Sequence, residues 1–130
     1  MLVLTDLKSS MACAMVAVKK NVPIIHVEAG LRSGDRKMPE EINRVLTDQI
    51  SDILFTTEAD AVNNLTQEGI AKSRVHFTGN VMIDTLMNHA DRAVPVDDTV
   101  KKSLNQAAWE SGQKFGLVTL HRPSNVDDKD

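Results

Sequence analysis

The stretch HVEAGLRSGDRKMPEEINR, residues 26–44, joins an apolar segment to an amphipathic one. The apolar run Val22–Val27 stops at Glu28, a basic loop with glycines follows, and Glu40 and Glu41 then open a helical pattern. This order of strand, loop and helix is typical of an α/β protein. Acids and arginines so close together at a strand-to-helix junction also predict a site that handles an anion.

The segment after Pro39 has the period of an amphipathic helix. Proline suits the first helical turn because its missing N–H would be unpaired there anyway. One apolar stripe, which we expect to face the sheet, is formed by Met38, Ile42, Val45, Leu46 and Ile50. Glu40, Arg44 and Thr47 lie roughly opposite to this stripe, so we expect them to face solvent or a cleft.

Other apolar runs alternate with helical patterns along the whole chain. We expect strands at residues 1–4, 22–27, 53–57, 75–78 and 115–120, and further helices at residues 10–20, 58–68, 80–92 and 99–109. Short apolar runs without polar alternation are typical of strands buried in a parallel sheet. The alternation predicts a parallel, doubly wound α/β sheet with right-handed crossovers. Within the helices we expect burial of Cys13, Met82, Leu86 and Met87.

The composition limits the class of protein. The chain has 130 residues, of which 42% are hydrophobic and 3% aromatic, and its net charge is −3. The lack of a clustered basic excess argues against a nucleic-acid partner, and no apolar run reaches the ~18–20 residues that span a bilayer. The single cysteine, Cys13, excludes an internal disulfide and fits a reducing compartment. We therefore expect a cytoplasmic protein without nucleic-acid or membrane partners.

Polar side chains follow the predicted strands, at the point where each strand ends. In parallel α/β sheets, ligands bind outside the carboxyl ends of the strands. The residues found there are Asp6, Glu28, the trio Thr56-Thr57-Glu58, the trio Thr78-Gly79-Asn80 and the pair His121-Arg122. A chain that leaves a sheet usually becomes polar, but this tendency alone does not explain so many ionisable groups at the strand ends. The pattern predicts a site at this edge.

The first of these groups also have purely structural interpretations. Asp6 either caps the next helix or positions a proton or a substrate hydroxyl. His26 and Glu28 are two residues apart and point to the same side of their strand. His26 is either a hydrogen-bonded, partly buried histidine or part of the site. An unpaired carboxylate at the end of an apolar strand is costly. Glu28 therefore either forms a structural pair with Arg32, four residues on, or is part of the functional site.

The remaining groups are equally open on sequence alone. Glu40 and Glu41 fit first-turn acids favoured by the helix dipole, and Glu40 could pair with Arg44 one turn later. Carboxylates that share one cleft would instead shift each other's pKa values apart, as acid and base roles require. Arg122 offers a planar fork for phosphate oxygens, and His121 can share a proton, unless the two only form a turn.

Metal and cofactor motifs are missing from the sequence. There is no HExxH, no CxxC and no cluster of histidines and acids at ligand spacing. There is also no GxGxxG and no P-loop. We therefore expect neither a metal nor a cofactor.

Longer motifs resemble one known family. HVEAGLRSGD, MPEEINRVLTD, SDILFTTE, TGNVMIDTL and VTLHRPSNVDD occur in the order and spacing of the non-hydrolysing UDP-N-acetylglucosamine 2-epimerases. The resemblance covers essentially the whole chain and implies two Rossmann-like domains in the glycosyltransferase-B arrangement. It assigns residues 1–92 to the N-terminal domain with its crossing helix, and residues 93–130 to a linker and the start of the C-terminal domain. It also implies a central fragment, which begins mid-way through one domain and stops just inside the next.

The resemblance implies a reaction and a set of residues for it. Such enzymes interconvert UDP-N-acetylglucosamine and UDP-N-acetylmannosamine for surface polysaccharides, by elimination and re-addition of UDP. By motif position, the implied catalytic residues are Asp6, Glu28, Glu40 and His121. The implied substrate-binding residues are Asp6, Glu28, Arg44, His121 and Arg122. Which carboxylate takes the C2 proton stays open, and the family usually has Gly where this chain has Thr5.

Other functions remain compatible with the same motifs. A hydrolysing 2-epimerase would release UDP and free N-acetylmannosamine. A nucleotide-sugar-binding fragment would bind without turnover, and a non-functional remnant would fold poorly because its outer strands lack neighbours. Members of the family commonly pair, so the resemblance also implies a homodimer.

Overall fold

The computed structural model describes residues 1–4, 6–100, 116, 118–120 and 123–126. The chain forms two compact units, Met1–Asn88 and His89–Asp130. The domain division expected after residue 92 stays a prediction, and each unit is described by itself.

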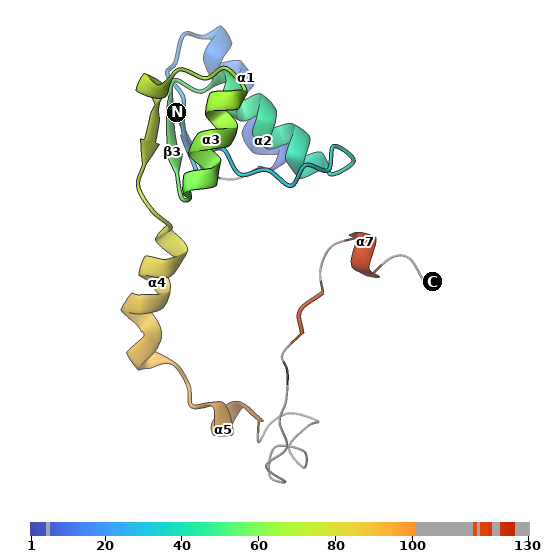
Figure 1. Ribbon diagram of the computed structural model, residues 1–130, viewed down its shortest axis with the longest axis vertical. Helices are drawn as coiled ribbons and strands as arrows, with labels where there is room; N and C mark the ends of the chain where they lie inside the picture. The colour runs from blue at the N-terminus through green and yellow to red at the C-terminus, as the bar shows by residue number, and fades with distance from the viewer. Residues whose placement is uncertain (5, 101–115, 117, 121–122, 127–130) are drawn as a thin grey trace. The chain divides into compact units, whose positions relative to one another are not determined.

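The first unit is built on a four-stranded parallel sheet in the order β1-β2-β3-β4 (Figure 1). The strands are β1 (Leu2–Val3), β2 (Ile25–Val27), β3 (Ile53–Thr56) and β4 (Val75–Phe77). Between them lie the helices α1 (Lys8–Lys19), α2 (Pro39–Ile50) and α3 (Ala59–Gln67), and the short 3-10 helix η1 (Lys72–Arg74). The predicted parallel α/β class is therefore confirmed.

Helices α1, α2 and α3 cover the same face of the sheet. Val3, His26 and Leu54 are partners in the strand register, so their side chains point to one side. Each of them packs against or contacts a different helix: Val3 with Ala14 of α1, His26 with Asp48 of α2, and Leu54 with Leu65 of α3. Right-handed crossovers have this result when the strand order follows the chain order.

The opposite face of the sheet is apolar and partly open. Leu2, Ile25 and Ile53 are partners in register on this side, and Val27 pairs with Phe55. Leu2 is 57% exposed, Ile25, Val27, Ile53 and Phe55 keep intermediate exposure, and His76, the partner of Phe55 in register, is exposed. The described helices thus supply one of the two layers of a doubly wound sheet.

Helix α2 contradicts the orientation predicted from its apolar stripe. Its buried residues are polar, namely Glu41, Asn43, Thr47 and Asp48. Leu46 of the predicted stripe is 46% exposed, whereas Thr47, expected to face solvent or a cleft, is completely buried. The prediction was wrong because most of these buried polar groups find hydrogen-bond partners in other segments, which offsets the cost of desolvation.

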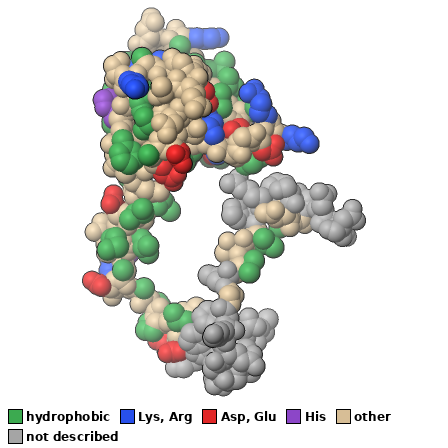
Figure 2. All heavy atoms as spheres, viewed as in Figure 1, with side chains coloured by type: hydrophobic (Ala, Val, Ile, Leu, Met, Phe, Trp, Pro, Cys, Tyr) green, Lys and Arg blue, Asp and Glu red, His purple; other side chains and the backbone are tan. Residues whose placement is uncertain are grey.

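Two further burial predictions were wrong. Helix α1 buries only Ala14 and Ala17, and Cys13 is exposed, because α1 turns its smallest side chains inward. Met82, Leu86 and Met87 of α4 (Val81–His89) are 66%, 66% and 70% exposed. Hydrophobic side chains are visible on the surface of this helix (Figure 2). Among the described residues no helix or strand makes an extensive contact with α4.

The second unit contains the described elements η2 (Ala90–Arg92), α5 (Val96–Val100) and α7 (Pro123–Val126). Helix α5 occupies part of the segment expected to be a linker. The helix predicted at residues 99–109 lies almost entirely outside the described residues. In the strand predicted at residues 115–120, the described residues 116 and 118–120 are not in a strand. None of the helices in the described part of the chain is long and apolar enough to cross a bilayer.

Candidate active site

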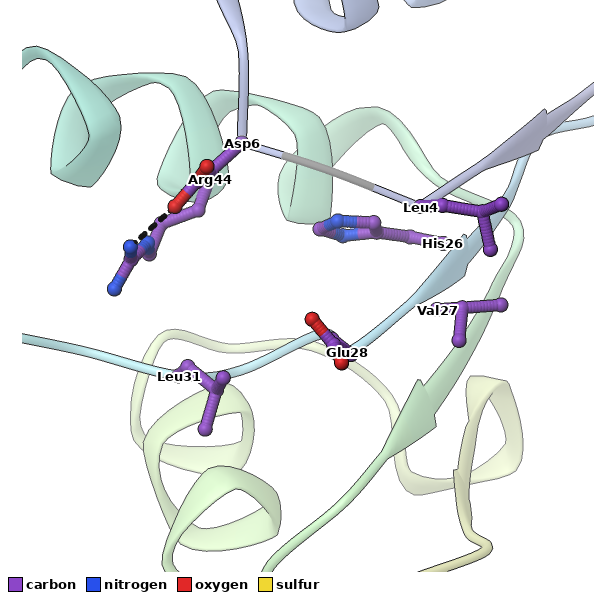
Figure 3. Close-up of a pocket in the computed structure, with 7 residues that line it drawn as sticks. All are labelled: Leu4, Asp6, His26, Val27, Glu28, Leu31 and Arg44. Atoms are coloured by element: carbon purple, nitrogen blue, oxygen red, sulfur yellow. Dashed lines mark hydrogen bonds and ion pairs between the residues drawn. The ribbon is translucent and has the colours of Figure 1, made fainter. Parts of the chain in front are cut away.

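A pocket lies at the carboxyl ends of β1 and β2. Its lining residues are Leu4, Asp6, His26, Val27, Glu28, Leu31 and Arg44 (Figure 3). The cavity measures about 140 Å³, below the ~300–1,000 Å³ of a pocket that takes up an entire ligand. It is therefore large enough for only part of a nucleotide-sized molecule. The structure brings together three predicted site residues here: Asp6, Glu28 and Arg44.

Arg44 of α2 holds Asp6 at the pocket. Its Nη2 atom lies 2.5 Å from Oδ2 of Asp6, and Asn43 donates a hydrogen bond of 2.8 Å to the carbonyl oxygen of Asp6. The Nη1 atom of Arg44 lies 3.6 Å from Oε2 of Glu41. The pairing of Arg44 with Glu40, one of the alternatives left open by the sequence, is not formed, because Arg44 contacts Asp6 and the buried Glu41 instead, whose charges water screens less.

Glu28 occupies a strained position at the end of β2. Its φ is +64°, a left-handed conformation that costs a residue other than glycine about 1–3 kcal/mol. Its carboxylate has no hydrogen bond or ion pair with any residue that the structure describes. Arg32, expected to pair with it, binds Asp48 and Glu68 instead. A carboxylate that lines a pocket, stands on a strained backbone and lacks a partner among the described residues is available to a ligand.

Glu40 lies outside this pocket. It lines an adjoining cavity of about 410 Å³, together with Asp6, Leu7, Lys8, Ser9, Pro39 and Asn43. Asp6 lines both cavities. The two cavities therefore meet at Asp6, and Glu40 belongs to the neighbouring one. The other two predicted site residues, His121 and Arg122, lie outside the described residues.

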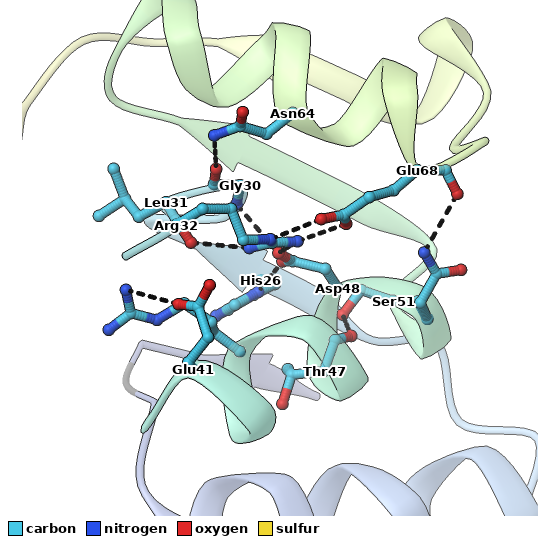
Figure 4. A network of polar contacts seen from close by, with 12 residues as sticks. His26, Gly30, Leu31, Arg32, Glu41, Thr47, Asp48, Ser51, Asn64 and Glu68 are labelled. Atoms are coloured by element: carbon cyan, nitrogen blue, oxygen red, sulfur yellow. Dashed lines mark hydrogen bonds and ion pairs between the residues drawn. The ribbon is translucent and has the colours of Figure 1, made fainter. Parts of the chain in front are cut away.

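A buried polar network lies directly behind the pocket (Figure 4). Asp48 is completely buried; its Oδ1 lies 2.5 Å from Nδ1 of His26, and its Oδ2 accepts a hydrogen bond of 3.0 Å from the N–H of Gly30. Arg32 lies 2.8 Å from Oδ2 of Asp48 and binds Glu68 through two hydrogen bonds of 2.7 and 2.6 Å. The network ties β2, α2 and the end of α3 together.

The charges in this network stabilise one another. Burial lowers the pKa of the Arg32 guanidinium, but its hydrogen bonds to Glu68 and Asp48 and the charges of both carboxylates raise that pKa more. The net shift is upward, so Arg32 stays a cation and compensates the buried charge of Asp48. Asp48 could not be recognised from the sequence, because the apolar stripe placed it on the wrong side of α2.

Glu41 organises the loop before α2. Its Oε2 accepts hydrogen bonds from the N–H (2.9 Å) and the hydroxyl (3.0 Å) of Ser33, and its Oε1 accepts one from the N–H of Gly34 (3.0 Å). Burial raises the pKa of the Glu41 carboxyl, but these hydrogen bonds and the charge of Arg44 lower it further, to below its usual value of 4.5. The ionised form therefore stabilises the folded state.

A Glu41→Gln variant should accordingly lose stability in a pH-dependent manner. Because the folded-state pKa is depressed, the contribution of Glu41 is complete above its usual value of 4.5 and disappears as the pH falls through the folded-state pKa. Urea unfolding should show the variant to be less stable at pH 7, with the difference shrinking below pH ~4.5. Glu40→Gln, one residue away, is the control, because Glu40 does not accept the hydrogen bonds from Ser33 and Gly34 that Glu41 accepts. A constant difference at all pH values for Glu41→Gln would contradict the assignment.

No group of three His, Cys, Asp or Glu side chains within the described residues could hold a metal ion.

A parallel sheet with a carboxylate-lined pocket at the carboxyl ends of its strands defines a ligand-binding α/β domain of the Rossmann type.

Comparisons with known proteins narrow this class. The sequence model of a family described as UDP-N-acetylglucosamine 2-epimerase matches residues 1–130. The chain is 42% identical over 125 residues to the UDP-N-acetylglucosamine 2-epimerase of Methanocaldococcus jannaschii, covering 96% of this chain and 33% of that protein. It is 43% identical over 129 residues to a UDP-2,3-diacetamido-2,3-dideoxy-D-glucuronate 2-epimerase of Pseudomonas aeruginosa, covering 98% and 34%. The chain therefore belongs to the UDP-N-acetylglucosamine 2-epimerase family.

Solved structures agree with this family. The Methanocaldococcus jannaschii UDP-GlcNAc 2-epimerase in complex with UDP-GlcNAc and UDP matches with a TM-score of 0.74 at 42% identity, over 98% of this chain and 34% of that one. The enzyme from Neisseria meningitidis bound to UDP-GlcNAc matches with a TM-score of 0.67 at 37% identity, over 82% and 29%. These matches confirm the predicted glycosyltransferase-B type of fold. The chain spans about a third of the length of the curated relatives that it matches.

Proposed function

We propose that this chain supplies part of the active site of a 2-epimerase that interconverts UDP-N-acetylglucosamine and UDP-N-acetylmannosamine. The observation that carries the proposal is the pocket in which Asp6, Glu28 and Arg44 meet. Its size suits a sugar ring better than an entire UDP-sugar. Relatives of this chain have been solved with UDP-GlcNAc.

The reaction needs a base for the C2 proton, a group that stabilises the departing diphosphate, and shelter from water. Glu28 is the carboxylate of the pocket that has no partner in the described part of the chain, so we assign it the role of the C2 base. Asp6 is held by Arg44, which suits it to orient the sugar rather than to abstract the proton. The proposed set also includes Glu40, which lines the adjoining cavity. We assign His121 and Arg122 to the binding of the diphosphate.

The proposal predicts that Glu28 is indispensable for proton exchange at C2. The test uses a chimera in which residues 1–130 replace the matching third of the Methanocaldococcus jannaschii enzyme. The chimera is incubated with UDP-N-acetylglucosamine in deuterated water. We expect deuterium at C2 and the manno product, and loss of both by a factor of at least ~100 in Glu28→Gln, the size of a general acid–base contribution.

Asp60→Asn is the matched control for this experiment, because Asp60 is an exposed acid in the first turn of α3. It should leave the exchange rate unchanged. An active chimera whose rate survives Glu28→Gln would contradict the assignment of the base, and a folded chimera that binds substrate without exchange would contradict the epimerase function. Free UDP with N-acetylmannosamine as the product would identify a hydrolysing 2-epimerase.

A second substrate follows from the comparisons. The chain is about as similar to the Pseudomonas aeruginosa UDP-2,3-diacetamido-2,3-dideoxy-D-glucuronate 2-epimerase as to the archaeal enzymes. The chemistry at C2 would be the same, but the sugar would carry an acetamido group at C3 and a carboxylate. The same deuterium assay with this sugar nucleotide separates the two substrates. The homodimer that the family resemblance implies and the cytoplasmic location expected from the sequence are further parts of the proposal, and sedimentation of the purified protein tests the first.

A further inference from the structure

His26 connects the buried network to the pocket. Its side chain is only 2% exposed, and its Nδ1 atom lies 2.5 Å from Oδ1 of Asp48. The same ring lines the pocket and points into the space between Asp6, Glu28 and Arg44 (Figure 3). Its second nitrogen, Nε2, has no hydrogen-bond partner among the residues that the structure describes. A histidine with a merely structural role would not need to turn a nitrogen without a partner toward a pocket.

The surroundings of Asp48 decide which nitrogen carries the hydrogen. An ionised carboxylate only accepts hydrogen bonds, so the contact with Asp48 requires an N–H at Nδ1. Arg32, 2.8 Å from Asp48, already supplies the cation that compensates its charge. The pair therefore does not need an imidazolium, and a neutral ring with its hydrogen on Nδ1 satisfies Asp48 completely. In that tautomer Nε2 has a lone pair and is a hydrogen-bond acceptor.

We propose that Asp48 fixes His26 as the neutral Nδ1–H tautomer, and that Nε2 of His26 accepts a hydrogen bond from a hydroxyl group of the sugar in the pocket. The inference rests on the proposed function for the identity of the ligand. Asp48, anchored by Arg32 and Glu68, is then a positioning residue, and His26 is a substrate contact beyond the residues that the motifs indicate. The arrangement resembles the support that a hydrogen-bonded carboxylate gives to a histidine in other sites, where it sets the tautomer and the orientation of the ring.

The tautomer can be measured without any ligand. Long-range ¹H–¹⁵N NMR of the 130-residue chain, at a pH where the imidazole is neutral, distinguishes a protonated from an unprotonated ring nitrogen. We expect Nδ1 to be protonated and Nε2 to be unprotonated in the native chain, and a mixture of tautomers in Asp48→Asn. A hydrogen on Nε2 in the native chain would overturn the inference, whatever the chain binds.

The sugar contact is tested by binding. His26→Asn keeps an amide nitrogen near the position of Nδ1, where it can still donate to Asp48, but it removes Nε2. By calorimetry we expect this variant to bind UDP-N-acetylglucosamine about tenfold more weakly, the value of one hydrogen bond, and to bind UDP as the native chain does. Equal affinity of both proteins for the sugar nucleotide would overturn the contact.

A structural role for His26 would give a different result. In that case His26→Asn would lower the melting temperature and weaken UDP and UDP-N-acetylglucosamine alike, which would also overturn the proposal. A native chain that binds neither compound would contradict the proposed function for this chain. The NMR measurement would then still decide the tautomer, so the two failures are distinguishable.

Discussion

A Gly30→Ala variant should lose a large part of the stability of the fold. Gly30 has a φ of +80°, and a Cβ atom there would lie 2.5 Å from the carbonyl oxygen of Ala61 and 2.9 Å from Cγ of Leu65. The left-handed backbone costs alanine about 1–2 kcal/mol, and overpacking adds about 1–3 kcal/mol. We expect urea unfolding to show a loss of about 2–5 kcal/mol, out of a typical total of about 5–15 kcal/mol.

Gly34→Ala is the matched control for this variant. Gly34 has a similar φ of +74°, but a Cβ atom there would meet no atom of the described part of the chain within 4 Å. Its loss should therefore be limited to the backbone cost of about 1–2 kcal/mol. If both variants lost the same free energy of unfolding, the close approach of α3 to Gly30 would contribute nothing to stability.

An Asp48→Ala variant should be the other severely destabilised one. Asp48 is completely buried, and its removal leaves Arg32, the ring of His26 and the N–H of Gly30 without their common acceptor. Removing one partner of a buried ion pair typically costs about 3–5 kcal/mol. Arg32 would keep its pairing with Glu68, but His26 and the N–H of Gly30 would lose the acceptor that Asp48 provides. Urea unfolding at pH 7 should show a loss of this size.

The neighbouring Thr47 provides a control in the same buried face of α2. Its side chain is also completely buried, but its hydroxyl oxygen has no hydrogen-bond partner among the described residues. Thr47→Val, which keeps the shape and removes the hydroxyl, should therefore leave stability unchanged or raise it. An Asp48→Ala variant no less stable than Thr47→Val would show that the network contributes nothing to the fold.

The fold was predictable from the sequence as far as local patterns determine it. Apolar runs that alternate with helical periods were enough for the parallel sheet and for the positions of β1 to β4. The orientation of α2 was not predictable in this manner, because a pattern of polar and apolar residues assumes that polar side chains face outward. Glu41 and Asp48 violate that assumption, since their acceptors are satisfied by Ser33, Gly34 and His26.

The position of the pocket was predictable from the sequence, but the partners of its residues were not. The rule for the carboxyl ends of strands brought Asp6 and Glu28 to one edge of the sheet, and the structure places them in one pocket. Their partners were predicted from nearness in sequence, and this failed for Arg32. Its partner Glu68 is 36 residues away in the chain, and such a contact exists only after α2 and α3 have packed beside the same loop.

The backbone at Glu28 shows a conflict between the stability of the fold and the presence of a carboxylate in the pocket. The other described positions with a left-handed backbone carry Asn21 or glycine, the residue types that tolerate this conformation at least cost. Selection for stability alone would favour glycine or asparagine at position 28 as well. Directed evolution of this chain for heat resistance alone should therefore discard the Glu28 carboxylate early, and with it the group to which we assign the C2 proton.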